Sequence, residues 1–168
     1  LPGGGDLADR YLVIGDHYDH LGLVDPARAP NGPPAEGAYY PGANDNASGV
    51  AGLLALARRL RETAPGDTIR FVAFVNEEPP FFQTPEMGSF VYAAAARERN
   101  DRIVAMLSLE TMGYYSDARR SQRYPFPFSL FYPDTGNFIG FVSNLGSRRL
   151  LQQTVTAFRR NSNFPVVG

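Results

Sequence analysis

The 168-residue sequence has no cysteine, no lysine and only two histidines. The absence of cysteine excludes disulfides and thiolate metal ligands, but it leaves the redox compartment undetermined. All sixteen basic residues are arginine, which we interpret as a compositional habit rather than a site. The formal charge of −1 gives no electrostatic reason to expect nucleic acid or an anionic membrane as a partner.

Long apolar runs are also missing. No stretch approaches the ~18 consecutive apolar residues that a membrane span needs, and no basic-then-apolar signal segment opens the chain. The first residue is Leu1 rather than methionine, and the chain stops at Gly168 in the middle of an element pattern. We therefore expect one domain over residues 1–168, incomplete at both ends.

Short apolar runs alternate with helical patterns along the chain. The predicted strands lie at residues 11–14 (ended by Gly15), 68–75, 103–109 and 138–142. The predicted helices lie at 47–62, 87–99 and 147–160, and long irregular segments at 25–41 and 113–136. This alternation predicts an α/β fold, a three-layer α/β/α sandwich with a mostly parallel, mixed central sheet. In such sheets ligands gather at the carboxyl ends of the strands.

Candidate metal ligands follow the first predicted strand. His17 comes just after it, and Asp19 is two residues further on, so in an extended chain both side chains point to the same side. A carboxylate there can accept the imidazole N–H and fix the tautomer that presents the other nitrogen to a metal. His20 has no such support, and we interpret it as structural.

Acidic residues lie at the start of the first predicted helix and after the second and third predicted strands. Asp45 lies between Gly42 and Gly49 at the start of a predicted helix. There it could cap the helix, as Asn44 and Asn46 could, or bridge two cations. Glu77 and Glu78 follow the second strand in an apolar neighbourhood, and Glu110 closes the third strand. Of the adjacent pair, one can ligate a metal while the other acts as general base on water.

Four segments taken together resemble the co-catalytic zinc aminopeptidases, family twenty-eight of the metallopeptidases (clan MH). The segments are His-Tyr-Asp (17–19), Gly-Ala-Asn-Asp-Asn-Ala-Ser-Gly (42–49), Phe-Val-Asn-Glu-Glu (74–78) and Met-Gly-Ser (87–89). The similarity covers roughly residues 10–115. It implies a zinc-exopeptidase-like fold and a hydrolase that removes terminal residues from peptide substrates.

The resemblance also implies the role of each residue. His17 and Glu110 would hold one zinc, Glu78 would hold a second zinc, and Asp45 would bridge the two ions. Glu77 would be the general base and then the proton donor to the leaving amine. Asp19 would orient His17.

Two positions depart from the family pattern. Many relatives have aspartate where this chain has Glu110. The second zinc of the family takes a histidine from a late segment, and no histidine follows His20 here. Either the chain is a C-terminally truncated member, which we favour, or its second metal site is lost. We therefore predict that the 168-residue chain is weakly active or inactive as a peptidase.

Two other functions fit the same residues less well. Glutaminyl-peptide cyclotransferases look similar but use a single zinc, whereas the set here suits two. A non-catalytic binding domain on the same fold would be expected to lose ligands or the base. The aromatic segment 114–132, with Phe81 and Phe82, could line an apolar substrate pocket or belong to the core. Relatives are often exported, which leads us to expect an extracytoplasmic location. The sequence does not indicate an oligomeric state.

Overall fold

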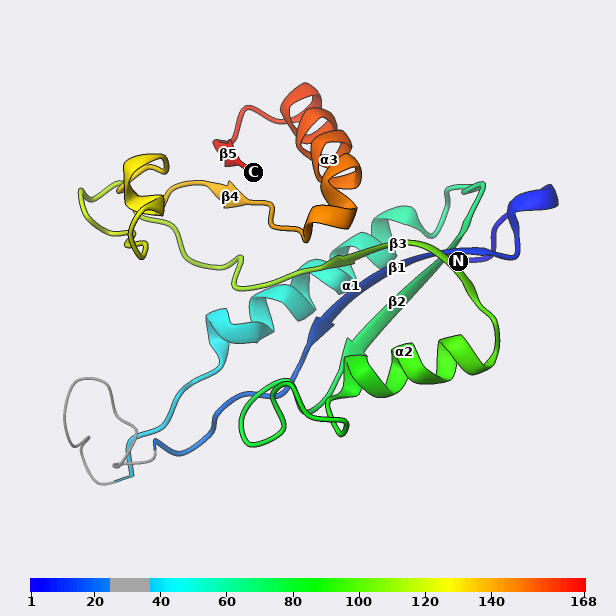
Figure 1. The fold of residues 1–168 in the computed structure, drawn as a ribbon, viewed down its shortest axis with the longest axis horizontal. Coiled ribbons are helices and arrows are strands. Elements are labelled where there is room, and N and C mark those ends of the chain that lie inside the picture. The colour runs from blue at the N-terminus through cyan, green and yellow to red at the C-terminus, as the bar shows by residue number, and fades with distance from the viewer. Residues whose placement is uncertain (25–36) are drawn as a thin grey trace. The chain divides into compact units, whose positions relative to one another are not determined.

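The structure is a computed structural model that describes residues 1–24 and 37–168. The chain divides into two compact units, Leu1–Gly113 and Tyr114–Gly168, and each is described by itself (Figure 1). The single domain expected over residues 1–168 stays a prediction. Most of the irregular segment predicted at 25–41 lies outside the described residues.

The first unit is built on a three-stranded sheet in the order β2-β1-β3, with β1 parallel to both neighbours (Figure 1). Its strands are β1 (Arg10–His17), β2 (Thr68–Phe74) and β3 (Arg102–Ser108), and its helices are α1 (Ser48–Leu60) and α2 (Gly88–Glu98). Two short turns, η1 (Gly5–Leu7) and η2 (Ala43–Ala47), precede β1 and α1. These elements confirm the predicted strand and helix order of residues 10–109.

One predicted boundary is wrong. The first strand was expected to end at Gly15, but β1 continues to His17. A Cβ atom on Gly15 would lie 2.5 Å from the ring of Phe74 on the neighbouring strand. The glycine therefore marks a close approach of that ring to the backbone rather than the end of the strand. Because the strand continues, His17 is buried at its carboxyl end.

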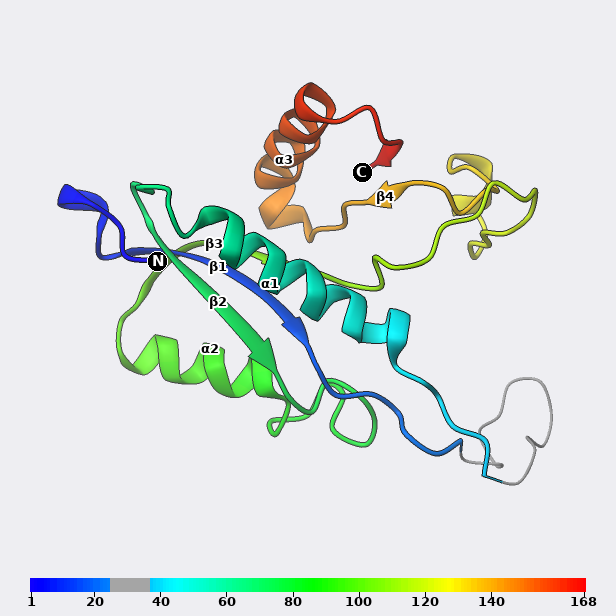
Figure 2. The ribbon, with the colours of Figure 1, turned by 180° about the vertical axis from the view of Figure 1, so that it is seen from behind.

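Helices contact both faces of this sheet. Leu53 of α1 packs with Ile14 and Ile69 in the buried core. Arg70 follows Ile69 on β2 and so points to the opposite face, where its guanidinium donates to the hydroxyl of Tyr92 on α2 at 3.3 Å. The two views of the ribbon agree with this arrangement (Figures 1 and 2). An α/β fold is thus observed, and the complete three-layer sandwich with a mixed sheet stays a prediction.

The second unit contains less regular structure. A two-residue pair of parallel strands, β4 (Ile139–Gly140) and β5 (Val166–Val167), stands where a longer strand was predicted at 138–142. Helix α3 (Arg148–Asn161) confirms the helix predicted at 147–160, and its Val155 is buried. The remaining elements are the short turns η3 (Phe128–Leu130) and η4 (Leu145–Ser147). In the described part of the chain, no helix combines the length and the apolar character that a membrane span requires.

Candidate metal centre

The parallel strands bring the predicted ligands to one edge of the sheet. His17 is the last residue of β1, Glu77 and Glu78 follow β2, and Glu110 follows β3. Asp45 joins them from η2, directly before α1. Since parallel strands end on the same side of the sheet, residues more than sixty positions apart in the chain become neighbours.

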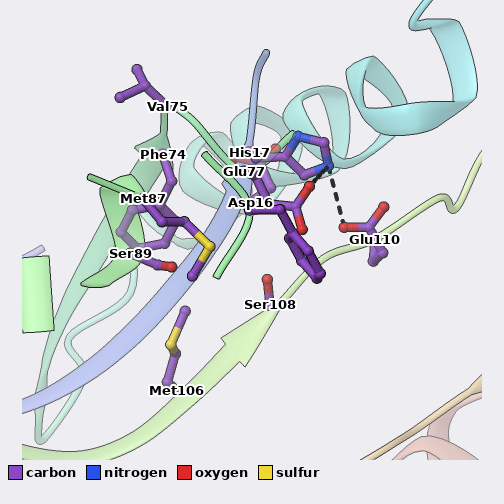
Figure 3. Close-up of a pocket in the computed structure, with 11 residues that line it drawn as sticks. Asp16, His17, Phe74, Val75, Glu77, Met87, Ser89, Met106, Ser108 and Glu110 are labelled. Carbon is purple, nitrogen blue, oxygen red and sulfur yellow. Dashed lines mark ion pairs between the residues drawn. The ribbon is translucent and has the colours of Figure 1, made fainter. Parts of the chain in front are cut away.

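His17 lies at the centre of this group. Its Nε2 atom is 3.1 Å from Asp45 Oδ1, 3.4 Å from Glu110 Oε2 and 3.7 Å from Glu77 Oε2. Figure 3 shows the imidazole facing the Glu110 carboxylate across the edge of the sheet. The side chain of His17 is 3% exposed, whereas those of Asp45 and Glu110 are about half exposed. A buried nitrogen donor is therefore surrounded by carboxylate oxygens that reach solvent.

Asp19 contacts both His17 and the segment after β2. The backbone carbonyl of Asp19 lies 3.1 Å from His17 Nδ1, and the nearer carboxylate oxygen lies at 3.5 Å. The same carboxylate accepts the backbone N–H groups of Glu77 at 3.3 Å and Glu78 at 3.1 Å. Asp19 thus lies beside His17, but its backbone carbonyl, rather than the expected carboxylate, is the closer partner of the imidazole. The carboxylate instead holds the two glutamates through their backbone, which the sequence did not indicate.

Glu77 and Glu78 face different spaces, as adjacent residues in an irregular segment can. Glu77 lines a cavity of about 170 Å³ together with His17 and Glu110 (Figure 3). Glu78 lines a separate cavity of about 180 Å³ together with Asp45. Their different surroundings are compatible with different roles for the two carboxylates.

Burial and mutual repulsion shift the protonation of this group. Burial raises the pKa of Glu78, and the charges of Asp45 and Glu77 raise it further. Burial also raises the pKa of Glu110, against the opposite effect of His17. Burial lowers the pKa of His17, but the surrounding carboxylates outweigh this effect and raise it overall. Like charges held this close favour a bound cation or bound protons.

The donor atoms suit a zinc ion. Two sets of side chains each place one ligand atom per residue within 4.8 Å of the others: His17 with Asp45 and Glu110, and His17 with Glu77 and Glu78. Imidazole nitrogen combined with carboxylate oxygen is a common zinc ligand set. No set found among the described residues joins Asp45 directly to Glu78.

The start of α1 differs from the simple cap considered for Asp45. Asp45 and Asn46 have non-helical backbone angles, and α1 begins after them at Ser48. The side chain that accepts a helix N–H is Asn46, whose Oδ1 receives the N–H of Gly49 at 3.1 Å. Asp45 is thereby left to face His17. The sequence suggested only a capping role for Asn46, although its place next to Asp45 could have indicated a role near the metal site.

A second buried carboxylate adjoins the site. Asp16 is fully buried, and neither of its carboxylate oxygens has a hydrogen-bond partner within residues 1–24 and 37–168. Burial raises its pKa, against a smaller opposite effect of His17. Asp16 has no role predicted from the sequence, and the available signal was its place between the apolar run 11–14 and His17.

Of the aromatic residues considered for a substrate pocket, Phe82 lies beside the site, whereas the segment 114–132 belongs to the other unit. Phe82 lines the 170 Å³ cavity beside His17 and Glu77. The aromatic segment 114–132 belongs to the second unit, where Phe126 and Phe131 are largely exposed. Its role in a substrate pocket stays a prediction.

Comparison with known proteins settles the family. The sequence model of peptidase family M28 matches residues 1–155. The chain belongs to this family. The resemblance drawn from the four segments is therefore confirmed. No solved structure matches the chain.

Several curated proteins are similar in sequence to this chain. The uncharacterized protein YfbL of Escherichia coli K12 is 41% identical over 156 residues, covering 92% of this chain and 45% of YfbL. A probable zinc metalloprotease of Pyrenophora tritici-repentis is 34% identical over 110 residues, covering 66% of this chain and 22% of that protein. A probable zinc metalloprotease of Leptosphaeria maculans is 34% identical over 130 residues, covering 76% of this chain and 26% of that protein. The chain thus spans less than half the length of these curated relatives.

Proposed function

We propose that this chain carries the metal centre of a zinc-dependent exopeptidase that removes amino-terminal residues from peptides. The observation that supports this most directly is the convergence of His17, Asp45 and Glu110, with donor atoms within 4.8 Å of one another. Membership of a peptidase family and the names of the fungal relatives agree with the assignment. Amino-terminal specificity rests on the resemblance of the sequence segments.

Each residue has a proposed part in holding metal. His17, Asp45 and Glu110 would hold one zinc, and Glu78 would contribute to a second zinc with Asp45 between the two. The 3.1 Å contact of Asp45 with His17, and the cavity that Asp45 shares with Glu78, support the bridging position. When bound, zinc supplies Lewis acidity toward a water nucleophile and a peptide carbonyl.

Glu77 is the proposed general base. Its carboxylate lines the cavity beside His17, and its backbone N–H is held by Asp19. In the hydrolysis, a Glu77 oxygen takes one proton from water as the water oxygen bonds to the peptide carbonyl carbon. The same oxygen returns the proton to the leaving amine as the C–N bond breaks, so Glu77 ends the cycle unprotonated.

A combined metal and product analysis tests this function. Zinc content is measured by elemental analysis after dialysis. The protein is then incubated for a long time with two forms of one peptide. Both forms are amidated at the C-terminus, and one has a free N-terminus whereas the other is acetylated there. We expect bound zinc and slow release of the first residue from the free peptide only. Absence of zinc, or cleavage inside both peptides, would contradict the proposal. Pyroglutamate formed from a glutaminyl peptide without hydrolysis would assign the chain to cyclisation instead.

The cellular location is a separate proposal. We propose an extracytoplasmic location, which rests only on the resemblance to a family with many exported members. Fractionation of cells that express the full-length protein would test it.

A further inference from the structure

The geometry assigns Asn46 the role of a positioning residue that holds the Glu110 carboxylate against His17. This inference rests on the metal site in the proposed function, and it concerns how the protein prepares one ligand before metal binds. Asn46 is 1% exposed and sits between Asp45 and the first residues of α1. Among residues 1–24 and 37–168 it is one of three buried polar or charged side chains, with Asp16 and His17, and it adjoins a proposed ligand in the sequence.

All four hydrogen-bonding positions of the Asn46 amide are used. Its Nδ2 donates to the backbone carbonyl of Leu109 at 2.9 Å and to Glu110 Oε2 at 3.4 Å. Its Oδ1 accepts the N–H of Gly49 at 3.1 Å and the N–H of Thr111 at 3.1 Å. A primary amide offers two donors and two acceptor lone pairs, so this one is saturated. Because two oxygens surround the nitrogen and two N–H groups surround the oxygen, the neighbours determine the orientation of the amide.

These contacts connect η2, directly before α1, to the segment that follows β3. Three of the four involve Leu109, Glu110 or Thr111, which are more than sixty residues further along the chain. They fasten the backbone on both sides of Glu110 as well as its carboxylate. The atom that accepts the hydrogen bond from Asn46, Glu110 Oε2, is also the atom that lies 3.4 Å from His17 Nε2. The amide therefore limits rotation of the carboxylate.

Besides His17, Asn46 is the only side chain found in polar contact with the Glu110 carboxylate among the described residues. The Glu110 side chain is 50% exposed, and a glutamate has three rotatable bonds whose freedom is lost when a metal binds. A hydrogen-bonded partner behind a ligand removes part of that loss in advance. Such outer partners typically raise metal affinity by about 10–100-fold.

Nearby side chains of the same turn provide a matched control. Asn44 Oδ1 accepts the N–H of Gly113 at 2.8 Å, so it also ties the η2 turn to the segment after β3. No contact joins the Asn44 side chain to Glu110 among those found in the described residues. Asn44→Ala therefore removes a bond of similar kind from the same turn without touching the ligand.

The test measures zinc affinity and metal-free stability separately. Zinc affinity is determined by competition with a chelating dye, and stability by thermal unfolding in EDTA. The proteins are wild type, Asn46→Ala, Asn44→Ala, Glu110→Gln and the Asn46→Ala/Glu110→Gln double variant. We expect Asn46→Ala to weaken zinc binding by about 10–100-fold, and Asn44→Ala by much less. In the Glu110→Gln background most of the Asn46→Ala effect should disappear, because the two residues act through one contact.

The results distinguish a positioning role of Asn46 from a purely structural one. Loss of metal-free stability with unchanged zinc affinity, or an equal loss of affinity with and without Glu110, would show that Asn46 is only structural. If Asn46→Ala does not fold, Asn46→Ser replaces it, since its hydroxyl can still accept the Gly49 N–H but is too short to reach Glu110. Wild-type protein that binds no zinc would end the proposed function and this inference together. Wild-type protein that binds zinc with an unaffected Asn46 variant would end this inference alone.

Discussion

Residues 1–113 and 114–168 differ in charge as much as in structure. The first region has fifteen acidic residues and nine arginines, a formal charge of −6, and the second has two acidic residues and seven arginines, a charge of +5. Both histidines and all seven glutamates are in the first region. Six of the seven buried hydrophobic residues found in the described chain are there as well, and Val155 is the seventh.

The difference shows which region would carry the carboxylate chemistry of the proposed function. Acidic residues gather in the region whose parallel strands end together, and there they crowd around one imidazole. In the second region the arginines lie mainly on α3 and in irregular segments. Surface charge of either sign is ordinary, whereas several carboxylates facing one buried histidine call for a cation.

The largest expected effect comes from removing the proposed base. Glu77→Gln keeps the shape of the side chain but cannot accept the proton. We expect kcat to fall by on the order of 10²–10⁴, with zinc content unchanged, as followed by product release and elemental analysis. Asp134→Asn, an exposed carboxylate of the second region, is the control and should leave both unchanged. Equal turnover of wild type and Glu77→Gln would place the base elsewhere.

Core substitutions test whether the two regions contribute differently to stability. Leu53 packs with Ile14 and Ile69 beneath α1, so Leu53→Ala should lower the free energy of unfolding by about 2–5 kcal/mol. Val155→Ala, at the buried position of α3, should lower it by roughly 1.5–2 kcal/mol, because this substitution removes fewer carbon atoms than Leu53→Ala does. Denaturant unfolding gives both values. A larger effect at Val155 would show that the second region holds the more important core.

Removing the charge of the proposed bridge should affect metal more than fold. Asp45→Asn retains the side-chain size and takes away the negative charge 3.1 Å from His17 Nε2. We expect zinc affinity to fall by at least the ~10–100-fold that loss of an outer-shell partner costs, measured by competition with a chelator. Asp117→Asn in the second region is the matched control. An unchanged affinity for Asp45→Asn would remove Asp45 from the ligand set.

The smallest expected effect is a pH dependence that originates in the first region. The pKa values of His17, Glu78 and Glu110 are raised, so the folded metal-free protein binds more protons than the unfolded chain above about pH 4.5. Its free energy of unfolding should therefore decrease as pH rises through the raised pKa values. In the second region the raised groups are tyrosines, Tyr115 and Tyr124, whose ordinary pKa is 10.0.

Zinc should reverse this trend, because zinc and protons compete for the same ligands. Thermal unfolding at about pH 5.5 and pH 7.5, in EDTA and in excess zinc, measures both slopes. The midpoint in EDTA should fall with pH, and the increase caused by zinc should grow with pH. Metal-free protein that becomes more stable with rising pH would contradict the predicted shifts.

Much of the first region could be predicted from sequence because its signals are local. The apolar run 11–14, the β-branched segment 68–75 and the helical spacing of residues 47–62 each indicate their element without knowledge of the fold. The end of β1 could not be predicted, because the close approach of Phe74 to Gly15 is a contact between strands. The strand at 138–142 was overestimated for a similar reason, since an apolar run forms a strand only as far as it finds a partner.

The sequence by itself determined which side chains could bind a metal and in what order they follow the strands. The types of residue, the absence of cysteine and the four family segments are all readable along the chain. Only the tertiary structure decided that Asp45, rather than a neighbouring asparagine, faces His17, and that Asn46 joins α1 to Glu110. These relations join residues dozens of positions apart. They depend on how parallel strands align their carboxyl ends, which local sequence does not encode.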